Sequence, residues 1–304
     1  MIVKFEHLKR NVKASVRKFN KFSLGAKVVL IFYFCLFVFE AIIHLMPVFF
    51  VVNISFKNAY NPLDAFAIEP ELFTFQNVLD VFTKFKVSGN LGFLGMFYNS
   101  LWSTTLRIVT SVASSTMLAY ALARFRFPGR NFLYAIVIFI QTVPIMGAGA
   151  ADFKLRQALG MVNNPALIWI SWAVGFDYTC FILYGTFQGI SKSYSESAEL
   201  DGASQLQVLC NIIFPMAFPA ILAMSITNFT GHWDDYATFQ IYLNKFPNLA
   251  YGLYQYGNSK DGAFKGGKMG YYAALLCSCM PVVIIYTCSQ TLILKNIAVG
   301  GLKG

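Results

Sequence analysis

Charge is the scarcest property of this 304-residue chain, in which only 12% of the residues are charged and 14 are acidic. Histidine is also rare, with three residues, and the six cysteines form no C-x2-C pair and have no histidine cluster beside them. A metal site is therefore not predicted, and the cysteines are better explained as free thiols that pack as small hydrophobic groups. The sequence has no nucleophile–base constellation either, so it does not predict an enzyme.

Hydrophobic residues, in contrast, are abundant. They make up 57% of the chain, 31 residues are phenylalanine, and the mean hydropathy is +0.55, far from the averages of soluble domains. A helix needs about 20 apolar residues to cross a bilayer. Six runs of about this length are predicted to do so, at residues 28–52, 94–123, 131–150, 166–190, 215–233 and 270–293. We therefore expect an all-α polytopic membrane protein with six transmembrane helices.

The basic residues predict how these spans are oriented. The first 27 residues contain eight lysines and arginines against one acid, Glu6. Three more arginines follow the second span and two lysines follow the last span, at Arg124, Arg126, Arg130, Lys295 and Lys303. Six spans place all of them on one side, which the positive-inside rule makes the cytoplasm, so both termini are expected there. The net charge of +10 then meets anionic lipid headgroups rather than nucleic acid.

The layout divides the chain into four regions. Residues 1–27 are predicted to form a basic cytoplasmic arm, and residues 28–93 the first span with its outer loop. Residues 94–293 form a core of five spans, and residues 294–304 a cytoplasmic tail. Within the core, residues 192–215 form a short cytoplasmic segment between two spans, which we call the elbow.

The elbow is polar and partly acidic, ESAELDGASQLQVLCNIIFP from Glu196 to Pro215, although hydrophobic spans flank it. Its pattern predicts two short helices broken at Gly202, because glycine supplies the positive φ that such a turn needs. Ser193 and Glu196 have the spacing of a capping box at the start of the first helix. Pro215 stands where the next membrane helix can begin. A helical elbow that projects from a bilayer suits the docking of a protein partner.

Five residues of the elbow have the spacing E-x-A-x3-G-x9-I-x2-P, namely Glu196, Ala198, Gly202, Ile212 and Pro215. This spacing resembles the signature loop of permease subunits in binding-protein-dependent ABC importers. Members of that family usually have EAA at its start, and Ser197 is a small departure from it.

Three further segments resemble the same family. Ala119–Arg130, AYALARFRFPGR, is similar to its loop between the second and third helices. Gly231–Asp235 is similar to its G-x-W-N-D run, with Asp234 in place of the usual Asn. Gly300–Gly304 looks like the short tail of the maltose-type sugar permeases. The resemblance covers about Asn99 to Gly304.

The resemblance implies a permease subunit with the type I ABC importer fold, for sugars or oligosaccharides, in a bacterial cytoplasmic (inner) membrane. It implies a second permease subunit, two copies of a cytoplasmic ABC ATPase and an extracytoplasmic solute-binding protein as partners, within the lipid bilayer. The partner subunits would bind and hydrolyse ATP, so no cofactor is expected in this chain. Its own imitation of a phosphate loop, Gly262–Lys268, is followed by Met269 where serine or threonine is needed.

The same resemblance implies roles for three groups of residues. The elbow would sit in a groove of the ATPase and transmit its movement, through Glu196, Ser197, Ala198, Asp201, Gly202 and Ala203. The tail would either enter the interface between the two ATPases or be frayed, as chain ends usually are; its residues are Gly301, Leu302, Lys303 and Gly304. A Tyr-rich outer loop would either reach into the binding protein or pack at the membrane surface; its residues are Tyr254, Gln255, Tyr256 and Asn258.

Several ionisable residues are expected inside spans, where a charge is costly. Glu40 and His44 are spaced i, i+4, so they can bond each other. Arg107 can pair with an acid as interhelical glue. Asp177, with Tyr178, either does the same or offers hydrogen bonds to sugar hydroxyls in a water-filled path.

Two other functions remain open at this stage. One is a permease for another solute, such as a peptide, an amino acid or an anion, because the elbow pattern is shared across those importers. The other is a proton-coupled secondary transporter that uses Glu40, His44 and Asp177, although no inverted repeat in the sequence supports it.

Overall fold

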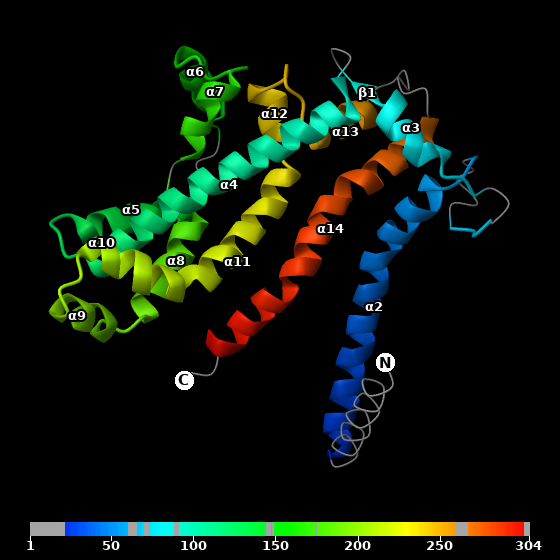
Figure 1. Cartoon of the computed structure of the whole chain (residues 1–304). Helices are drawn as coiled ribbons and strands as arrows, with labels where there is room; N and C mark the ends of the chain where they lie inside the picture. Colours follow the sequence, from blue (N-terminus) through cyan, green and yellow to red (C-terminus); the bar gives the residue numbers. More distant parts are fainter. Residues whose placement is uncertain are drawn as a thin grey trace.

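The computed structural model describes residues 22–59, 66–69, 73–87, 91–143, 147, 149–173, 175–258 and 267–300, the last ten by their backbone alone. Nearly all of them lie in helices (Figure 1). The elements are α2 (Leu24–Ser55), α3 (Gln76–Lys84), β1 (Lys86–Val87), β2 (Leu91–Gly92), α4 (Phe93–Arg124), α5 (Arg130–Thr142), α6 (Gly149–Ala158), α7 (Pro165–Ile168), the 3-10 turn η4 (Trp169–Trp172), α8 (Tyr178–Gly189), α9 (Ser193–Leu200), α10 (Gln205–Val208), the π-helical segment η5 (Leu209–Ile213), α11 (Phe214–Trp233), α12 (Tyr236–Tyr242), α13 (Leu249–Asn258) and α14 (Gly267–Gly300). The tail residues Gly301–Gly304 lie outside the described part of the chain.

Within the described residues, four helices are long and apolar enough to cross a membrane. They are α2, α4, the continuous helix formed by α10, η5 and α11, and α14. These match the first, second, fifth and sixth expected spans. The prediction of an all-helical polytopic fold is confirmed.

The third and fourth expected spans are shorter than the hydrophobic runs that predicted them. Helix α5 has 13 residues, about 20 Å at a rise of 1.5 Å per residue, and it ends at Val143, which is extended with ψ 106°. Val143 precedes Pro144 in the sequence, and proline disfavours the helical conformation of the residue before it. The fourth run is divided between α7, η4 and α8, because Asp177 begins a new helix as the N-cap of α8.

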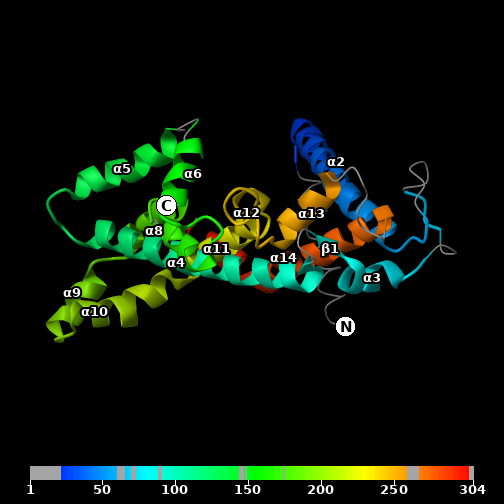
Figure 2. The same cartoon turned by 90° about the horizontal axis from the view of Figure 1, so that it is seen from above.

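The helices are arranged so that the two ends of the molecule differ. The elbow helices α9 and α10 lie at the same end as the N-terminal end of α2 and the C-terminal end of α14 (Figure 1). Helices α3, α6, α12 and α13 lie at the opposite end, with the antiparallel pair β1 and β2. Figure 2 shows α4 running through the length of the molecule, with α5 and the elbow on opposite sides of its C-terminal half.

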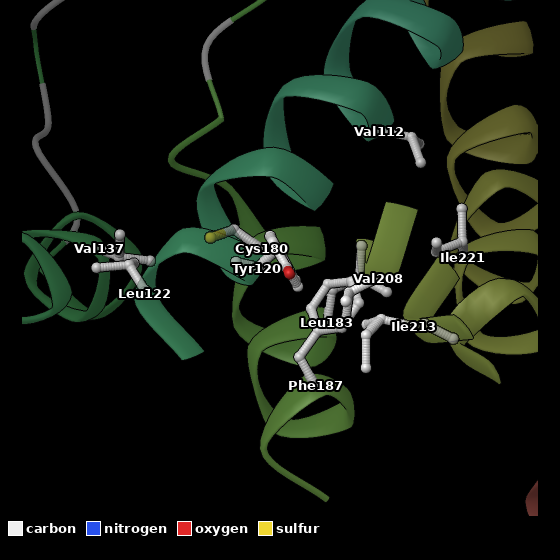
Figure 3. Close-up of a cluster of buried hydrophobic side chains, with 12 residues drawn as sticks. Val112, Tyr120, Leu122, Val137, Cys180, Leu183, Phe187, Val208, Ile213 and Ile221 are labelled. Atoms are coloured by element: carbon white, nitrogen blue, oxygen red, sulfur yellow. The ribbon is translucent and has the colours of Figure 1, made fainter. Parts of the chain in front are cut away.

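Helix α4 is the centre of the fold because small polar and apolar side chains let its neighbours approach closely. Ser111, Ser115 and Ala119 are buried on it, and α8, α11 and α13 all pack against it. Small residues at such interfaces are typical of membrane helices. A cluster of buried side chains, including Tyr120 and Phe187, joins α4 and α8 to the elbow (Figure 3).

Helix α2, in contrast, is almost entirely exposed. Of its 32 residues, only Ile54 and Ser55 are buried. An apolar helix of this length that the described residues cover only near its C-terminal end presents a surface for lipid or for another membrane helix.

Candidate functional site

The elbow forms around Gly202, as the sequence predicts. Gly202 has φ +86°. Its N–H donates to the carbonyl oxygen of Glu199 at 3.0 Å, and the N–H of Ala203 donates to the carbonyl oxygen of Ala198 at 2.9 Å. This pair of bonds is a Schellman motif, in which glycine takes the left-handed position just beyond a helix. The turn between α9 and α10 is therefore fixed by local hydrogen bonds.

The capping box lies in α10 and not in α9, so the prediction for Ser193 and Glu196 is wrong. Ser193 is already the first helical residue of α9, and the N-cap is Lys192, which makes no side-chain capping bond within the described residues. In α10 the N–H of Gln207 donates to Ser204 Oγ at 3.4 Å, and the N–H of Ser204 donates to Gln207 Oε1 at 2.8 Å. The S-x-x-E spacing alone did not show where α9 begins.

Pro215 is the second residue of α11, at the start of a membrane helix as predicted, but the chain is already helical before it. Helices α10 and α11 are joined without a break by the π-helical segment η5. Proline removes a hydrogen bond of the helical ladder, and a π-helical turn is one way in which a helix adjusts to such a disruption. The part of the elbow that follows the turn and the next span thus form one helix of 29 residues.

The elbow has an inner and an outer face. Ala198 and Ala203 pack against the buried cluster of α4 and α8. Leu200 and Leu206 point outward, with 89% and 72% of their surfaces exposed. Sequence reasoning missed these two leucines, although apolar residues in a polar segment were the available signal.

The polar residues of the elbow complete its outer face. Glu196, Ser197, Asp201 and Gly202 are all exposed. Across the turn, Gln205 Nε2 donates to Glu199 Oε1 at 2.6 Å and so ties α10 to α9. The outer face therefore combines two exposed leucines with acidic groups beside a turn that is fixed by hydrogen bonds.

The four residues of the predicted Tyr-rich loop lie on helix α13. Tyr254 stacks on Tyr236 with 4.4 Å between ring centroids. The hydroxyl of Tyr256 donates to the carbonyl oxygen of Gly267 at 3.0 Å. Gln255 is half-buried, and Asn258 is exposed. A contact of this helix with a binding protein stays a prediction.

Glu40 and His44 do not form the side-chain pair that their spacing allows. His44 Nδ1 is instead hydrogen-bonded to the backbone carbonyl oxygen of Glu40 at 2.8 Å. Both residues lie on the exposed helix α2.

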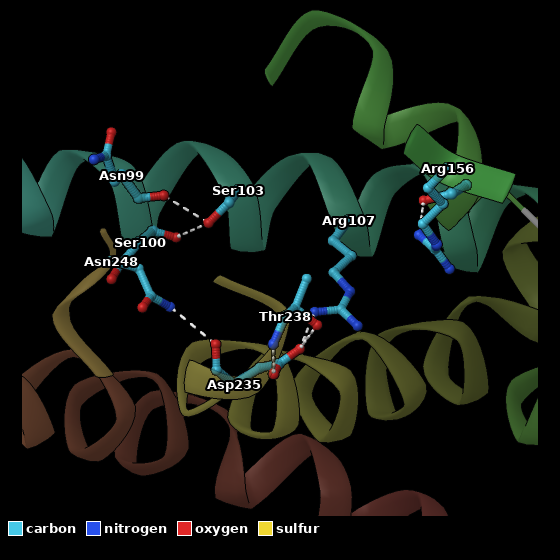
Figure 4. A network of polar contacts seen from close by, with 9 residues as sticks. Asn99, Ser100, Ser103, Arg107, Arg156, Asp235, Thr238 and Asn248 are labelled. Atoms are coloured by element: carbon cyan, nitrogen blue, oxygen red, sulfur yellow. Dashed lines mark hydrogen bonds and ion pairs between the residues drawn. The ribbon is translucent and has the colours of Figure 1, made fainter. Parts of the chain in front are cut away.

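Arg107 pairs with an acid, as expected, and its partner is Asp235. Arg107 Nη1 donates to Asp235 Oδ2 at 2.5 Å, which ties α4 to α12 (Figure 4). Asp235 also accepts hydrogen bonds from the N–H and Oγ1 of Thr238, at 3.0 and 2.6 Å. Burial acts to raise the pKa of Asp235, but the bonds from Arg107 and Thr238 outweigh it and lower that pKa below its ordinary range.

Asp177 likewise joins two helices. It caps α8 by accepting the N–H of Cys180 at 3.0 Å. It also accepts hydrogen bonds from Ser115 Oγ at 2.6 Å and from Ser111 Oγ at 3.0 Å, both on α4. The neighbouring Tyr178 is 58% exposed. Asp177 is thus interhelical glue, and it also lines the cavity described next.

A polar cavity of about 230 Å³ lies where α4, α6, η4, α8, α11 and α12 meet. Its lining includes Arg107, Arg156, Trp172, Asp177, His232 and Tyr242. Sequence reasoning had singled out Arg107 and Asp177 but missed the other four. Of these four, Arg156 could have been found in the sequence, because it follows Asp152 by four residues and such a pair can interact on one face of a helix.

The two arginines of the cavity are held in the same way. Each is paired with a carboxylate and lies over an aromatic ring. Arg107 is 5.4 Å from the ring centre of Trp172. Arg156 Nε donates to Asp152 Oδ2 at 2.8 Å and the guanidinium lies 4.7 Å from the ring centre of Tyr242.

Asp152 and Tyr242 affect each other's protonation. The hydroxyl of Tyr242 donates to Asp152. Burial acts to raise the pKa of Asp152, but the bonds from Tyr242 and Arg156 lower it overall. Burial raises the pKa of Tyr242, and the carboxylate adds to this effect. Asp152 is therefore held as a carboxylate that keeps Arg156 in place.

Gly175 lets the segment before Asp177 approach α4 closely, and we expect Gly175→Ala to lower the stability of the purified protein. An added Cβ would lie 2.8 Å from the carbonyl oxygen of Ser114 and 3.2 Å from the N of Ser115. Backbone atoms cannot swing aside, so the free energy of unfolding should fall by about 1–3 kcal/mol. Thermal unfolding in detergent measures this. Gly185→Ala, where a Cβ meets no described atom within 4 Å, should have little effect, and equal stabilities would contradict the prediction.

Residues 112–299 match the family described as binding-protein-dependent transport system inner membrane component. The galactooligosaccharides transport system permease protein GanQ of Bacillus subtilis (strain 168) is 28% identical over 90% of this chain and 96% of its own length. The diacetylchitobiose uptake system permease protein NgcG of Streptomyces coelicolor is 28% identical over 87% of this chain and 86% of its own. The trehalose/maltose transport system permease protein MalG of Thermococcus litoralis is 25% identical, over 87% and 93%.

The fold is also similar to that of solved structures. A chain of a bacterial ABC transporter involved in the import of the acidic polysaccharide alginate matches with a TM-score of 0.72, over 89% of this chain and 98% of that chain. At 23% identity, this likeness shows the fold of the chain and not its substrate.

Proposed function

This chain belongs to the family of binding-protein-dependent transport system inner membrane components, and we propose that it is a permease subunit of an ATP-driven importer for sugars or oligosaccharides. The names of its relatives, which refer to galactooligosaccharides, diacetylchitobiose and trehalose/maltose, support the substrate class. The elbow is the single observation on which the coupling role depends.

In this proposal the outer face of the elbow binds a cytoplasmic ATPase. Leu200 and Leu206 enter an apolar groove of the partner, and Glu196 and Asp201 pair with basic groups at its rim. Gly202 keeps the turn compact. Because α10 continues into α11, a shift of the docked elbow moves a membrane-spanning helix. ATP binding and release by the partner then shift the spans between inward-facing and outward-facing states.

The proposed assembly contains a second permease subunit, two copies of the ATPase and an external solute-binding protein. The elbow and the described ends of α2 and α14 share one end of the molecule, which we assign to the cytoplasm. The opposite end, with α12 and α13, then faces the binding protein. The exposed helix α2 is available for the second permease subunit and for lipid. In this proposal the partner binds and hydrolyses ATP. This chain couples the ATPase to the membrane spans and forms part of the path of the solute, and it catalyses no reaction.

We expect Leu200→Asp to remove the ATPase from the purified complex. A charge at the most exposed apolar residue of the elbow would have to be buried without a partner in the docked state, which costs several kcal/mol. The experiment is affinity purification of the tagged full chain in mild detergent, followed by mass spectrometry. Wild-type chain should bring down an ATPase with an intact phosphate loop and a second polytopic protein.

The matched control is Leu155→Asp, which alters an equally apolar, 59% exposed residue on α6, at the other end of the molecule (Figure 1). It should retain the ATPase. Recovery of the wild-type chain alone would overturn the importer, and full recovery of the ATPase with Leu200→Asp would overturn the docking surface. Uptake that survives ATP depletion but stops when the proton gradient collapses would favour a secondary transporter instead.

A further inference from the structure

The polar cavity lies away from the elbow, and its residues take no part in docking the ATPase. We propose that this cavity binds one uncharged sugar unit of the transported saccharide, so that this subunit contacts the substrate itself. The inference rests on the proposed import function, since it assigns the substrate contact to a defined place in the path.

The hydrogen-bonding groups of the cavity are unevenly used. A guanidinium has five N–H donors. Among the described residues, Arg107 uses one of them, for Asp235, and Arg156 uses two, for Asp152 and Ser171. The carboxylate of Asp177 already accepts three hydrogen bonds. The cavity therefore offers spare donors and requires a ligand rich in oxygen acceptors.

The charges of the cavity exclude an anion as the preferred ligand. Arg107 and Arg156 face it, but each is neutralised by its own carboxylate, Asp235 and Asp152. Asp177 adds one further negative charge. With three carboxylates against two guanidinium groups, a phosphate or a uronate meets no excess of positive charge. Hydroxyl and ring oxygens of a neutral sugar satisfy the spare donors without adding charge.

The size and the rigidity of the cavity fit a single sugar unit. Its volume of about 230 Å³ lies below the roughly 300–1,000 Å³ typical of pockets for drug-sized ligands. Arg107 lies over the ring of Trp172 and Arg156 over that of Tyr242. Each is also tied to a carboxylate, so the donors are held in place before a ligand arrives. Fixed donors lower the ordering cost of binding.

The position of the cavity suits a substrate path. Its lining combines α4 with segments from two separate parts of the chain, α6 and η4 from one and the end of α11 with α12 from the other. His232 lies on α11, the helix that continues from the elbow. A ligand in the cavity thus contacts the same helix that the docked ATPase would move.

Binding is tested on the intact complex, purified through this chain, placed in lipid nanodiscs and kept free of the solute-binding protein. The probes are glucose, galactose, arabinose, N-acetylglucosamine and glucuronate, measured one at a time by saturation-transfer NMR. We expect saturable binding of at least one of the four neutral sugars, with glucuronate weaker. Arg156→Gln should weaken that binding by about tenfold or more, as expected for the loss of hydrogen bonds from a charged donor.

Two further variants separate binding from folding. Lys154→Gln changes an exposed cation on the same helix α6 and should leave binding unchanged. His232→Leu alters a ring that lines the cavity and has no hydrogen bond assigned among the described residues. This variant should therefore weaken the binding of the sugar without disturbing the two arginine–carboxylate pairs. The elution volume and subunit composition of each complex report its folding.

Each outcome decides one point. Equal sugar binding by wild type, Arg156→Gln and His232→Leu would overturn the site, and so would the absence of binding by every neutral probe. Preferential binding of glucuronate would overturn the assignment to an uncharged ligand. A complex that retains its ATPase but binds no sugar contradicts this inference alone, whereas a chain that purifies without an ATPase contradicts the import function itself.

Discussion

Replacing Gly202 by aspartate should abolish solute uptake while leaving the chain in the membrane. A Cβ at Gly202 would meet no described atom within 4 Å, so the new side chain projects from the elbow without a clash inside the subunit. It adds a negative charge to a turn that already has three acids, Glu196, Glu199 and Asp201. The left-handed conformation at φ +86° adds a cost of up to ~1–2 kcal/mol for a residue with a side chain.

The effect should therefore appear at the docked partner rather than in the isolated subunit. A loss of 1–2 kcal/mol in coupling alone reduces uptake by roughly tenfold, and a charge buried in an apolar groove costs more. The measurement is uptake of the radiolabelled saccharide into cells, with the amount of membrane-inserted chain determined on the same samples.

Two variants serve as controls for Gly202→Asp. Gly189→Asp adds the same charge at an exposed glycine at the end of α8, where a Cβ also has open space, and should retain most of the uptake. Gly202→Val adds no charge but places a β-branched residue at a positive φ, so it should reduce the amount of folded chain as well. Normal uptake by Gly202→Asp would refute the role of this turn in coupling.

Arg107→Met should lower the free energy of unfolding by about 2–3 kcal/mol, less than the 3–5 kcal/mol typical of a fully buried ion pair. The Arg107 and Asp235 side chains are 21% and 18% exposed. Water therefore screens the pair in part, and its loss costs less than the loss of a fully buried pair. The substitution leaves the carboxylate of Asp235 with Thr238 as its remaining donor among the described residues. It also removes the link between α4 and α12.

A double-mutant cycle isolates the pair. In Arg107→Met with Asp235→Asn the unpaired charge is gone while asparagine can still cap α12, so part of the stability should return. Lys84→Met is the matched control, because Lys84 is half-exposed in its pair with Asp80 and such pairs contribute up to about 1 kcal/mol. Thermal unfolding in nanodiscs measures the two single variants Arg107→Met and Asp235→Asn, the double variant and Lys84→Met. An Arg107→Met protein no less stable than Lys84→Met would contradict the structural role of the pair.

Hydropathy predicts the long helices well because a helix that crosses a lipid bilayer must be apolar along most of its length. It fails at residues 131–150 and 166–190, where composition is apolar but the backbone is interrupted. In the first, Pro144 follows α5; in the second, the carboxylate of Asp177 caps a new helix and so interrupts the run. Such interruptions depend on single side chains, which an average over 20 residues does not register.

The elbow and the cavity differ in how much of each the sequence predicts. Gly202 could be predicted because a left-handed turn depends on the residues immediately around it. The partner of Arg107 could not, because Asp235 is 128 positions away. Arg156, Trp172 and Tyr242 come from three separate segments that meet only through the packing of the whole chain.

The π-helical segment η5 has a mechanical consequence. Because it joins α10 to α11 without a break, the 29 residues from Gln205 to Trp233 form one continuous helix, which bends between the elbow and the span (Figure 1). In the proposed importer, a movement of the elbow at Leu206 therefore reaches His232 in the cavity lining along one helix, without an intervening loop.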